Sequence, residues 1–128
     1  MPLTLLSFHH FHSPLKLSAL HTLTRTHTGP TSGLYLQGRP GALLISSPSV
    51  PALHAYVRAV KRMRWQRVHN LGTSEDQDHL LRLPPGALVR VGEMRGLVGA
   101  AGEHGGVGAG EWVRGAVRRG FGGAGGLR

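Results

Sequence analysis

The sequence predicts an α+β fold in which one antiparallel sheet carries two helices, built from residues 3–74. Two amphipathic segments with helix-start signals alternate with short apolar segments, and a Gly-Arg-Pro-Gly turn separates two of these apolar segments. The length of 128 residues fits one ordinary domain. With 40% hydrophobic residues, the chain can bury a core of modest size.

The first strand is predicted at residues 3–8, an apolar stretch that histidines follow. Ser13 and Pro14 predict a helix start, because serine can cap the first turn and proline at the first helical position gives up no needed N–H. We expect Gly29 and Pro30 to end this helix. Its expected apolar face consists of Leu15, Ala19, Leu20 and Leu23.

Two further strands are predicted at residues 33–37 and 41–46, on either side of the turn sequence Gly38-Arg39-Pro40-Gly41. In a turn that starts at Arg39, Pro40 takes the second position and Gly41 the third. This pattern suits a type II turn, because glycine takes a positive φ without steric cost. Residues 42–45 are continuously apolar, which is typical of a central strand buried on both faces.

A second helix is predicted to open at Ser49, Val50 and Pro51, and residues 65–71 alternate as a fourth strand would. The apolar stripe of this helix consists of Leu53, Tyr56, Val57 and Val60. The order of elements is therefore strand, helix, strand, strand, helix, strand. This order predicts a ferredoxin-like βαββαβ domain at residues 3–74, with one antiparallel sheet and both helices on one face.

The remaining residues, 75–128, form a glycine-rich C-terminal extension that we expect to be partly helical or disordered. From Gly86 onward, 15 of the 43 residues are glycine, and glycine inside a helix costs roughly 1 kcal/mol relative to alanine. A short strand at 87–91 and helical segments at 93–101 and 111–119 are the elements expected there.

The charge balance favours a polyanionic partner. The chain carries 15 Lys and Arg against 6 Asp and Glu, for a net charge of +9, and its first carboxylate is Glu75. Nucleic acid is the first candidate partner, and an acidic protein or an acidic membrane surface is the second. Acid–base catalysis mostly uses Asp, Glu or His held by a partner. Because residues 1–74 contain no Asp or Glu, they cannot form such a pair, and the sequence predicts no catalytic site and no cofactor.

The chain contains no cysteine, so disulfides and thiolate metal sites are excluded. None of its apolar runs approaches the roughly 20 residues that cross a bilayer, and the N-terminus lacks the pattern of a secretory signal. We therefore expect no membrane partner and an intracellular location, nuclear or cytoplasmic.

Five cations within ten residues surround Trp65 and are the main candidate site. Such side chains neutralise phosphates, and an exposed indole could stack on a base. The alternative is a solvated helix face, with Trp65 packed in the core at the junction of helix and strand. The candidate RNA-binding residues in this cluster are Arg58, Lys61, Arg62, Arg64 and Arg67.

Lys16 and Arg39 are two further candidates for RNA contact. Lys16 lies in the first helical turn, where free N–H groups can help to bind an anion, and Arg39 lies at a turn tip. Both are equally compatible with ordinary surface positions. His9, His10 and His12 suggest a metal site, but no carboxylate is near in sequence to orient them, so no metal is predicted.

A set of short motifs spread over about residues 5–72 points to a known family. These motifs are His9-His10-Phe11, Ser13, Lys16, Ser32-Gly33-Leu34, Gly38-Arg39-Pro40-Gly41-Ala42-Leu43-Leu44, Tyr56-Val57 and Met63-Arg64-Trp65. With them, the sequence resembles the small domain that follows RWD domains and that also forms the C-terminal domain of the spliceosomal protein Prp-three. One departure is Ser46-Ser47-Pro48, where relatives often carry Glu-Gly. No RWD domain precedes the match, so we expect a stand-alone or truncated copy.

The resemblance implies a ferredoxin-like fold and, through the splicing-factor branch, a ribonucleoprotein module that contacts small nuclear RNA. The RWD-linked branch implies instead a protein-interaction module, here one that docks an acidic partner. Residues 42–45 lack the aromatic side chains with which RNA-recognition sheets stack on bases. The sequence therefore favours RNA binding through the backbone phosphates, along the helix edge.

Overall fold

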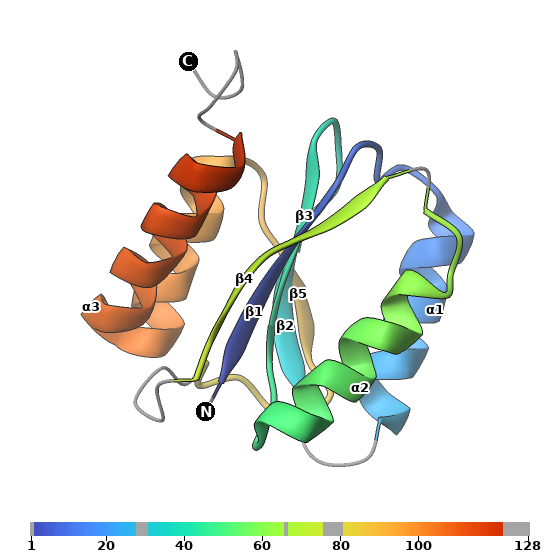
Figure 1. Ribbon diagram of the computed structural model, residues 1–128, viewed down its shortest axis with the longest axis horizontal. Coiled ribbons are helices and arrows are strands. Elements are labelled where there is room, and N and C mark those ends of the chain that lie inside the picture. Colours follow the sequence, from blue (N-terminus) through green and yellow to red (C-terminus); the bar gives the residue numbers. More distant parts are fainter. Residues whose placement is uncertain (1, 28–30, 66, 76–80, 122–128) are drawn as a thin grey trace.

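The structure, a computed structural model, describes residues 2–27, 31–65, 67–75 and 81–121. It is an α+β fold with a five-stranded mixed sheet of order β4-β1-β3-β2-β5 and three helices (Figure 1). The elements are β1 (Leu3–Phe8), α1 (Pro14–Thr26), β2 (Ser32–Leu36), β3 (Gly41–Ser46), α2 (Val50–Lys61), β4 (Val68–Ser74), β5 (Leu88–Arg90) and α3 (Met94–Phe121). The predicted α+β class and the predicted order of the first six elements are confirmed, whereas the five-stranded mixed sheet differs from that of a simple βαββαβ domain.

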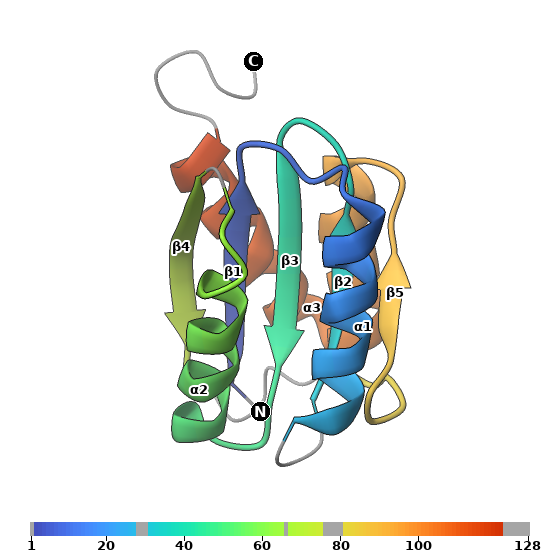
Figure 2. The same ribbon diagram turned by 90° about the vertical axis from the view of Figure 1, so that its right-hand side faces the viewer.

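The sheet differs from the predicted one in its pairing and in its layers. Strands β1, β3, β2 and β4 pair antiparallel, but β5 pairs parallel with β2, so the sheet is mixed rather than antiparallel. Helices α1 and α2 cover one face, and α3 covers the other (Figures 1 and 2). The expectation that both helices of residues 3–74 lie on one face is confirmed (Figures 1 and 2). Helix α3 covers the opposite face, which is also apolar because the side chains of β1, β2 and β3 alternate between the two faces.

Two cores result, one on each side of the sheet. Leu53, Tyr56 and Val60 of α2 pack with Phe8 and Leu43 on one face. On the other face, α3 packs against β1, β2 and β3 through an apolar set that includes Leu5, Leu34, Leu44, Leu97 and Val113. Every residue of β3 is buried, as predicted for the central strand.

The predicted helix starts are confirmed by their caps. Ser13 Oγ accepts a hydrogen bond from the N–H of Lys16 at 3.2 Å, and Ser49 Oγ accepts one from Ala52 at 3.2 Å. The predicted apolar face of α1 is partly wrong, since Leu15 is 83% exposed. Ala19 is also exposed, whereas Leu20 is buried as predicted, together with Thr24 one turn later. Gly29 and Pro30 lie outside the described residues.

Two local predictions before and after α2 are also wrong. The turn between β2 and β3 is not type II: Gly38 has the positive φ of 141°, and the Arg39–Pro40 peptide bond is cis. Gly41 instead begins β3, where a side chain would collide with Phe11. Strand β4 begins at Val68 rather than at Trp65, which lies outside the strand with its indole packed against the core.

Helix α3 consists of two halves joined at Gly106, whose φ of 87° and ψ of 173° are not helical. The halves lie against each other where Gly102 meets Gly110, so closely that a Cβ on Gly110 would stand 3.0 Å from the Gly102 Cα. The expected helical segment 111–119 falls within α3, the expected segment 93–101 begins one residue before α3, and β5 falls within 87–91. The sheet and its second core thus continue past residue 74.

Candidate functional site

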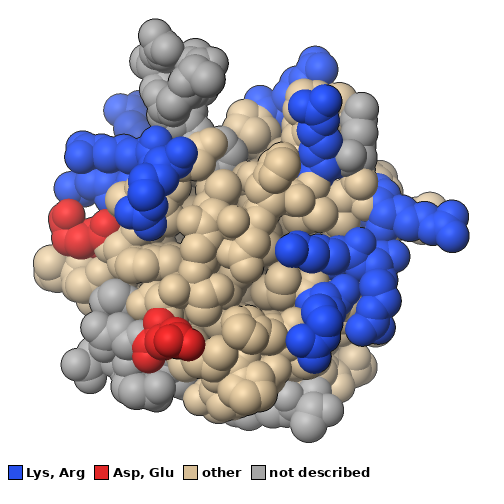
Figure 3. All heavy atoms as spheres, in the orientation of Figure 1, with Lys and Arg blue, Asp and Glu red and all other residues tan. Residues whose placement is uncertain are grey.

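The five clustered cations are all exposed and lie close together in sequence. We call them the basic surface: Arg58, Lys61, Arg62, Arg64 and Arg67. Arg58 and Lys61 belong to the last turn of α2, and Arg62 is its C-cap with φ −71° and ψ −10°. Figure 3 shows Lys and Arg side chains gathered on its right, over the α2 side of the molecule, while the visible Asp and Glu side chains lie in its left half.

Helix electrostatics explain part of this arrangement. The last turn of a helix carries partial negative charge from its unpaired carbonyls, and cations there are stabilising by roughly 0.3–1 kcal/mol. Arg58 and Lys61 meet this need of α2. Arg64 and Arg67 lie beyond the helix, so the dipole does not account for them.

Ion pairing does not neutralise the basic surface. Within residues 2–27, 31–65, 67–75 and 81–121, the ion pairs join Arg95 to Glu93 and Arg114 to Glu111. Neither pair includes a member of the basic surface. Its five charges therefore face solvent, where they can attract an anionic partner.

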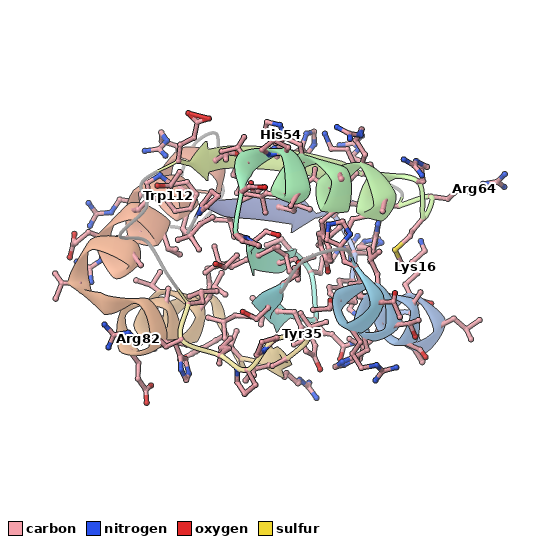
Figure 4. All side chains as sticks on the ribbon, turned by 90° about the horizontal axis from the view of Figure 1, so that it is seen from below. Lys16, Tyr35, His54, Arg64, Arg82 and Trp112 are labelled. Carbon is pink, nitrogen blue, oxygen red and sulfur yellow. The ribbon has the colours of Figure 1, made fainter. Side chains whose placement is uncertain are left out.

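Lys16 joins the basic surface from α1. Its Nζ donates a hydrogen bond to the Arg64 carbonyl at 2.8 Å and lies 4.8 Å from the centroid of the Trp65 ring. The backbone of Arg64 is in the left-handed region, with a φ of 60°, and its carbonyl is the group that accepts the hydrogen bond from Lys16. Figure 4 shows Arg64 projecting away from the body while Lys16 lies beside the same segment. The ammonium of Lys16 thus ties α1 to the segment that carries the arginines.

Trp65 packs as a core residue. Its ring centroid lies 4.1 Å from that of Phe8 and 5.3 Å from that of Phe11, the latter edge to face. Its Nε1 donates a hydrogen bond to the Val60 carbonyl at 2.9 Å. With these contacts and Lys16 on its ring, the indole holds the basic surface in place and offers no free platform for a base.

Arg39 is exposed in the turn between β2 and β3, outside the segment 58–67. Its neighbour Pro40 lines a small hollow together with Arg67, so the turn adjoins the far end of the basic surface. The structure therefore places Lys16 beside Arg64, and it places the turn that carries Arg39 next to Arg67.

Sequence reasoning missed a second group of cations, on the last turns of α3. Arg114, Arg118 and Arg119 are exposed there, and Figure 3 shows a second set of Lys and Arg side chains at its upper left, over α3. The signal was present in the sequence as an Arg-Arg pair after an apolar pattern. The high glycine content of this region obscured it.

The rings of the histidines that follow β1 lie close together, and those of His9 and His10 are stacked. The ring centroids of His9 and His10 lie 4.3 Å apart, and those of His10 and His12 lie 5.8 Å apart. Across the part of the chain that the structure describes, no three His, Asp or Glu side chains are grouped so that they could hold a metal ion.

Comparison with protein-family models and with curated proteins finds no match to this chain. Among the described residues, no helix combines the length and the apolar character that crossing a membrane requires.

Proposed function

We propose that this chain is a non-catalytic RNA-binding module of the type that ends the splicing factor Prp-three. In this proposal, residues 3–74 form the ferredoxin-like part, to which β5 and α3 are added. The RNA partner is a small nuclear RNA, which would place the protein in the nucleus. The observation that carries the proposal is the basic surface, five exposed cations without an ion-pair partner among the described residues.

The layers of the fold support contact through RNA phosphates rather than through bases. Sheet-face recognition needs an open sheet with exposed aromatic side chains. Here α1 and α2 cover one face and α3 covers the other (Figure 2). Since the sheet is covered and Trp65 is engaged in packing, the exposed arginines and lysines are the groups left to bind RNA.

The size of the basic surface sets the expected salt dependence. About five contacts to single-stranded RNA give a slope of roughly −3.5 in a plot of log affinity against log salt concentration. Between about 50 and 200 mM salt, such a protein loses about 100-fold in affinity. Lys16 contributes less, because one of its donors is already bonded to the Arg64 carbonyl.

Replacing Lys61, Arg62 and Arg64 together by glutamine tests the proposal. The three side chains are exposed, so we expect the variant to fold. With about two contacts left, the affinity loss over the same salt range should shrink to roughly 7-fold. The measurement is a titration of fluorescent single-stranded and duplex RNA at both salt concentrations.

A matched control removes the same net charge elsewhere. Arg82, Arg90 and Arg95 are exposed and lie on the α3 and β5 side, and Figure 4 shows Arg82 far from Arg64. Their triple replacement by glutamine should leave the salt slope nearly unchanged. Equal losses in the two triple variants, or unchanged affinity in the first, would show that the basic surface is not the RNA contact.

The same titration distinguishes the alternative, a module that docks an acidic protein as in RWD-linked proteins. A preference for one RNA form that persists at the higher salt supports RNA as the partner. Weak binding that disappears equally for all RNA forms indicates only a basic surface and favours the acidic protein.

A further inference from the structure

A small hollow of about 170 Å³ opens where β1 ends and β4 begins, beside the last turn of α3. Its lining includes Ser7, His9, Pro40, Arg67, His69 and Gly120. Only Arg67 belongs to the basic surface described above, so most of the hollow has no role in the proposed function.

Strand geometry explains why these polar side chains share one face. Ser7 of β1 stands opposite His69 of β4 in the antiparallel register. The N–H of His9 donates a hydrogen bond to the Arg67 carbonyl at 3.1 Å, which continues the pairing past the end of the strand. Because side chains alternate, Ser7 and His9 face the α3 side, as do Arg67 and His69. Phe8 and Val68, between them, face the opposite core.

The chemistry of the lining suits an anion. A serine hydroxyl, two imidazoles and a guanidinium can all donate hydrogen bonds, and the lining contains no carboxylate. The positive charge of the Arg67 guanidinium would repel a metal cation in the hollow. Arginine is instead the side chain that matches the oxygens of a phosphate.

The size of the hollow limits the ligand to a small group. Pockets for drug-sized molecules measure roughly 300–1,000 Å³, whereas one water in the liquid occupies about 30 Å³. A volume of about 170 Å³ therefore accommodates a phosphate group with a few waters, but not a whole nucleotide.

Charges around the hollow also favour an anion. Arg39 precedes the lining residue Pro40, and Arg118 and Arg119 are exposed next to the lining residue Gly120. The carbonyl end of α3 is partially negative, and the two arginines in its last turn offset that charge.

We propose that this hollow binds a phosphate monoester, with Arg67, His9, His69 and the Ser7 hydroxyl as its donors. The site goes beyond the proposed RNA contact and does not require it. The monoester can come from the terminal phosphate of an RNA strand or from a small free phosphate, and the experiment separates these two sources.

Titration of the full chain with inorganic phosphate, followed by amide chemical shifts, tests the site directly. We expect saturable shifts centred on Ser7, His9 and His69, which sodium chloride at equal ionic strength does not reproduce. The double variant His9→Ala/His69→Ala should bind phosphate more weakly by at least a factor of about ten, since it removes two hydrogen-bond donors to a charged group. Both residues are exposed, so we expect the fold to persist.

The matched control is His54→Ala, an exposed histidine on α2 that does not line the hollow (Figure 4). It should bind phosphate as the original chain does. If phosphate causes no localised shifts, or if both histidine variants bind it as the original chain does, the site is overturned.

A second arm identifies the source of the phosphate. The same short RNA is titrated with and without a terminal phosphate. Tighter binding of the phosphorylated RNA, lost in His9→Ala/His69→Ala but kept in the Lys61, Arg62 and Arg64 triple variant, assigns the hollow to an RNA end. Phosphate shifts at the hollow without any RNA binding support a free phosphate as the ligand, and in that case the proposed function fails while the site stands.

Discussion

Tyr56 is a residue whose chemistry depends on the fold. Its side chain is completely buried, and its hydroxyl lies 2.9 Å from Thr24 Oγ1. Thr24 Oγ1 in turn donates to the Leu20 carbonyl at 2.7 Å, so the hydroxyl pair links α1 to α2. Burial raises the pKa of Tyr56 to about 12, and the hydrogen bond with Thr24 acts in the opposite direction.

This raised pKa predicts a specific loss of stability in alkali. Because the folded-state pKa lies above the ordinary value of 10, the contribution of Tyr56 is fully present below pH 10 and is lost as the pH rises toward 12. Two pKa units correspond to about 3 kcal/mol. Urea unfolding of the original chain and of Tyr56→Phe, between pH 8 and 12, should show this loss in the original chain alone.

At neutral pH, Tyr56→Phe should cost only about 0.5–1.5 kcal/mol, since Thr24 keeps its bond to Leu20. Parallel stability curves for the two proteins across the alkaline range would contradict the buried state of the hydroxyl.

Single residues also show the limit of what sequence pattern predicts. The caps at Ser13 and Ser49 depend on neighbours three residues away, so the sequence indicates them correctly. The exposure of Leu15 and the local conformation at Gly38 and Gly41 depend on tertiary neighbours, such as Phe11 against Gly41. No local pattern contains those neighbours.

At the scale of elements, α3 depends on the absence of a side chain at one glycine. Gly110 is buried against Gly102, and an added Cβ would press on backbone that cannot rotate away. Gly99, also in α3, is exposed, and an added Cβ would meet nothing within 4 Å. The two positions therefore form a matched pair.

We expect Gly99→Ala to raise the free energy of unfolding by roughly 0.5–1 kcal/mol, the gain of alanine over glycine in a helix. Gly110→Ala should lower it by about 1–2 kcal/mol, because overpacking exceeds that gain. Urea denaturation followed by circular dichroism measures both. Stabilisation of equal size in the two variants would show that the halves of α3 do not pack at this point.

Elements with a strong local sequence pattern were predicted correctly, and elements that depend on distant contacts were not. The apolar stripe of α2 and the buried run of β3 are readable from the sequence, and the structure confirms both. The close packing of the α3 halves could not be predicted from the sequence. Glycine by itself indicates a weak helix, and only the structure shows that two helical segments meet at Gly102 and Gly110. The basic surface was visible as a charge run, whereas the hollow requires the register of β1 and β4.

For the whole molecule, the second core joins the first 74 residues to the rest of the chain. Leu5, Leu34 and Leu44 from the sheet are buried against α3. Removing residues 75–128 would expose this apolar face to water at a cost of roughly 25 cal/mol for each Å² uncovered. We expect the fragment 1–75 to bind a hydrophobic dye, to associate in gel filtration and to lack a cooperative urea transition.

Leu5→Thr/Leu44→Thr, introduced into the same fragment, provides a control, because it makes the uncovered face more polar and should reduce dye binding. A monomeric fragment 1–75 with a cooperative transition would instead establish residues 3–74 as a domain that folds without α3.

Strand order has a consequence for synthesis. The interior strands β1, β3 and β2 emerge early, whereas β4 and β5, which form the two edges, emerge later. In the finished fold, every residue of β2 is buried. Until residue 90 leaves the ribosome, however, β2 lacks its partner β5 on one side, and such an open edge can pair with another chain. The three residues of β5, with Arg90 exposed, close that edge with a charged and very short strand. The nascent chain is therefore most exposed to self-association while it is still incomplete.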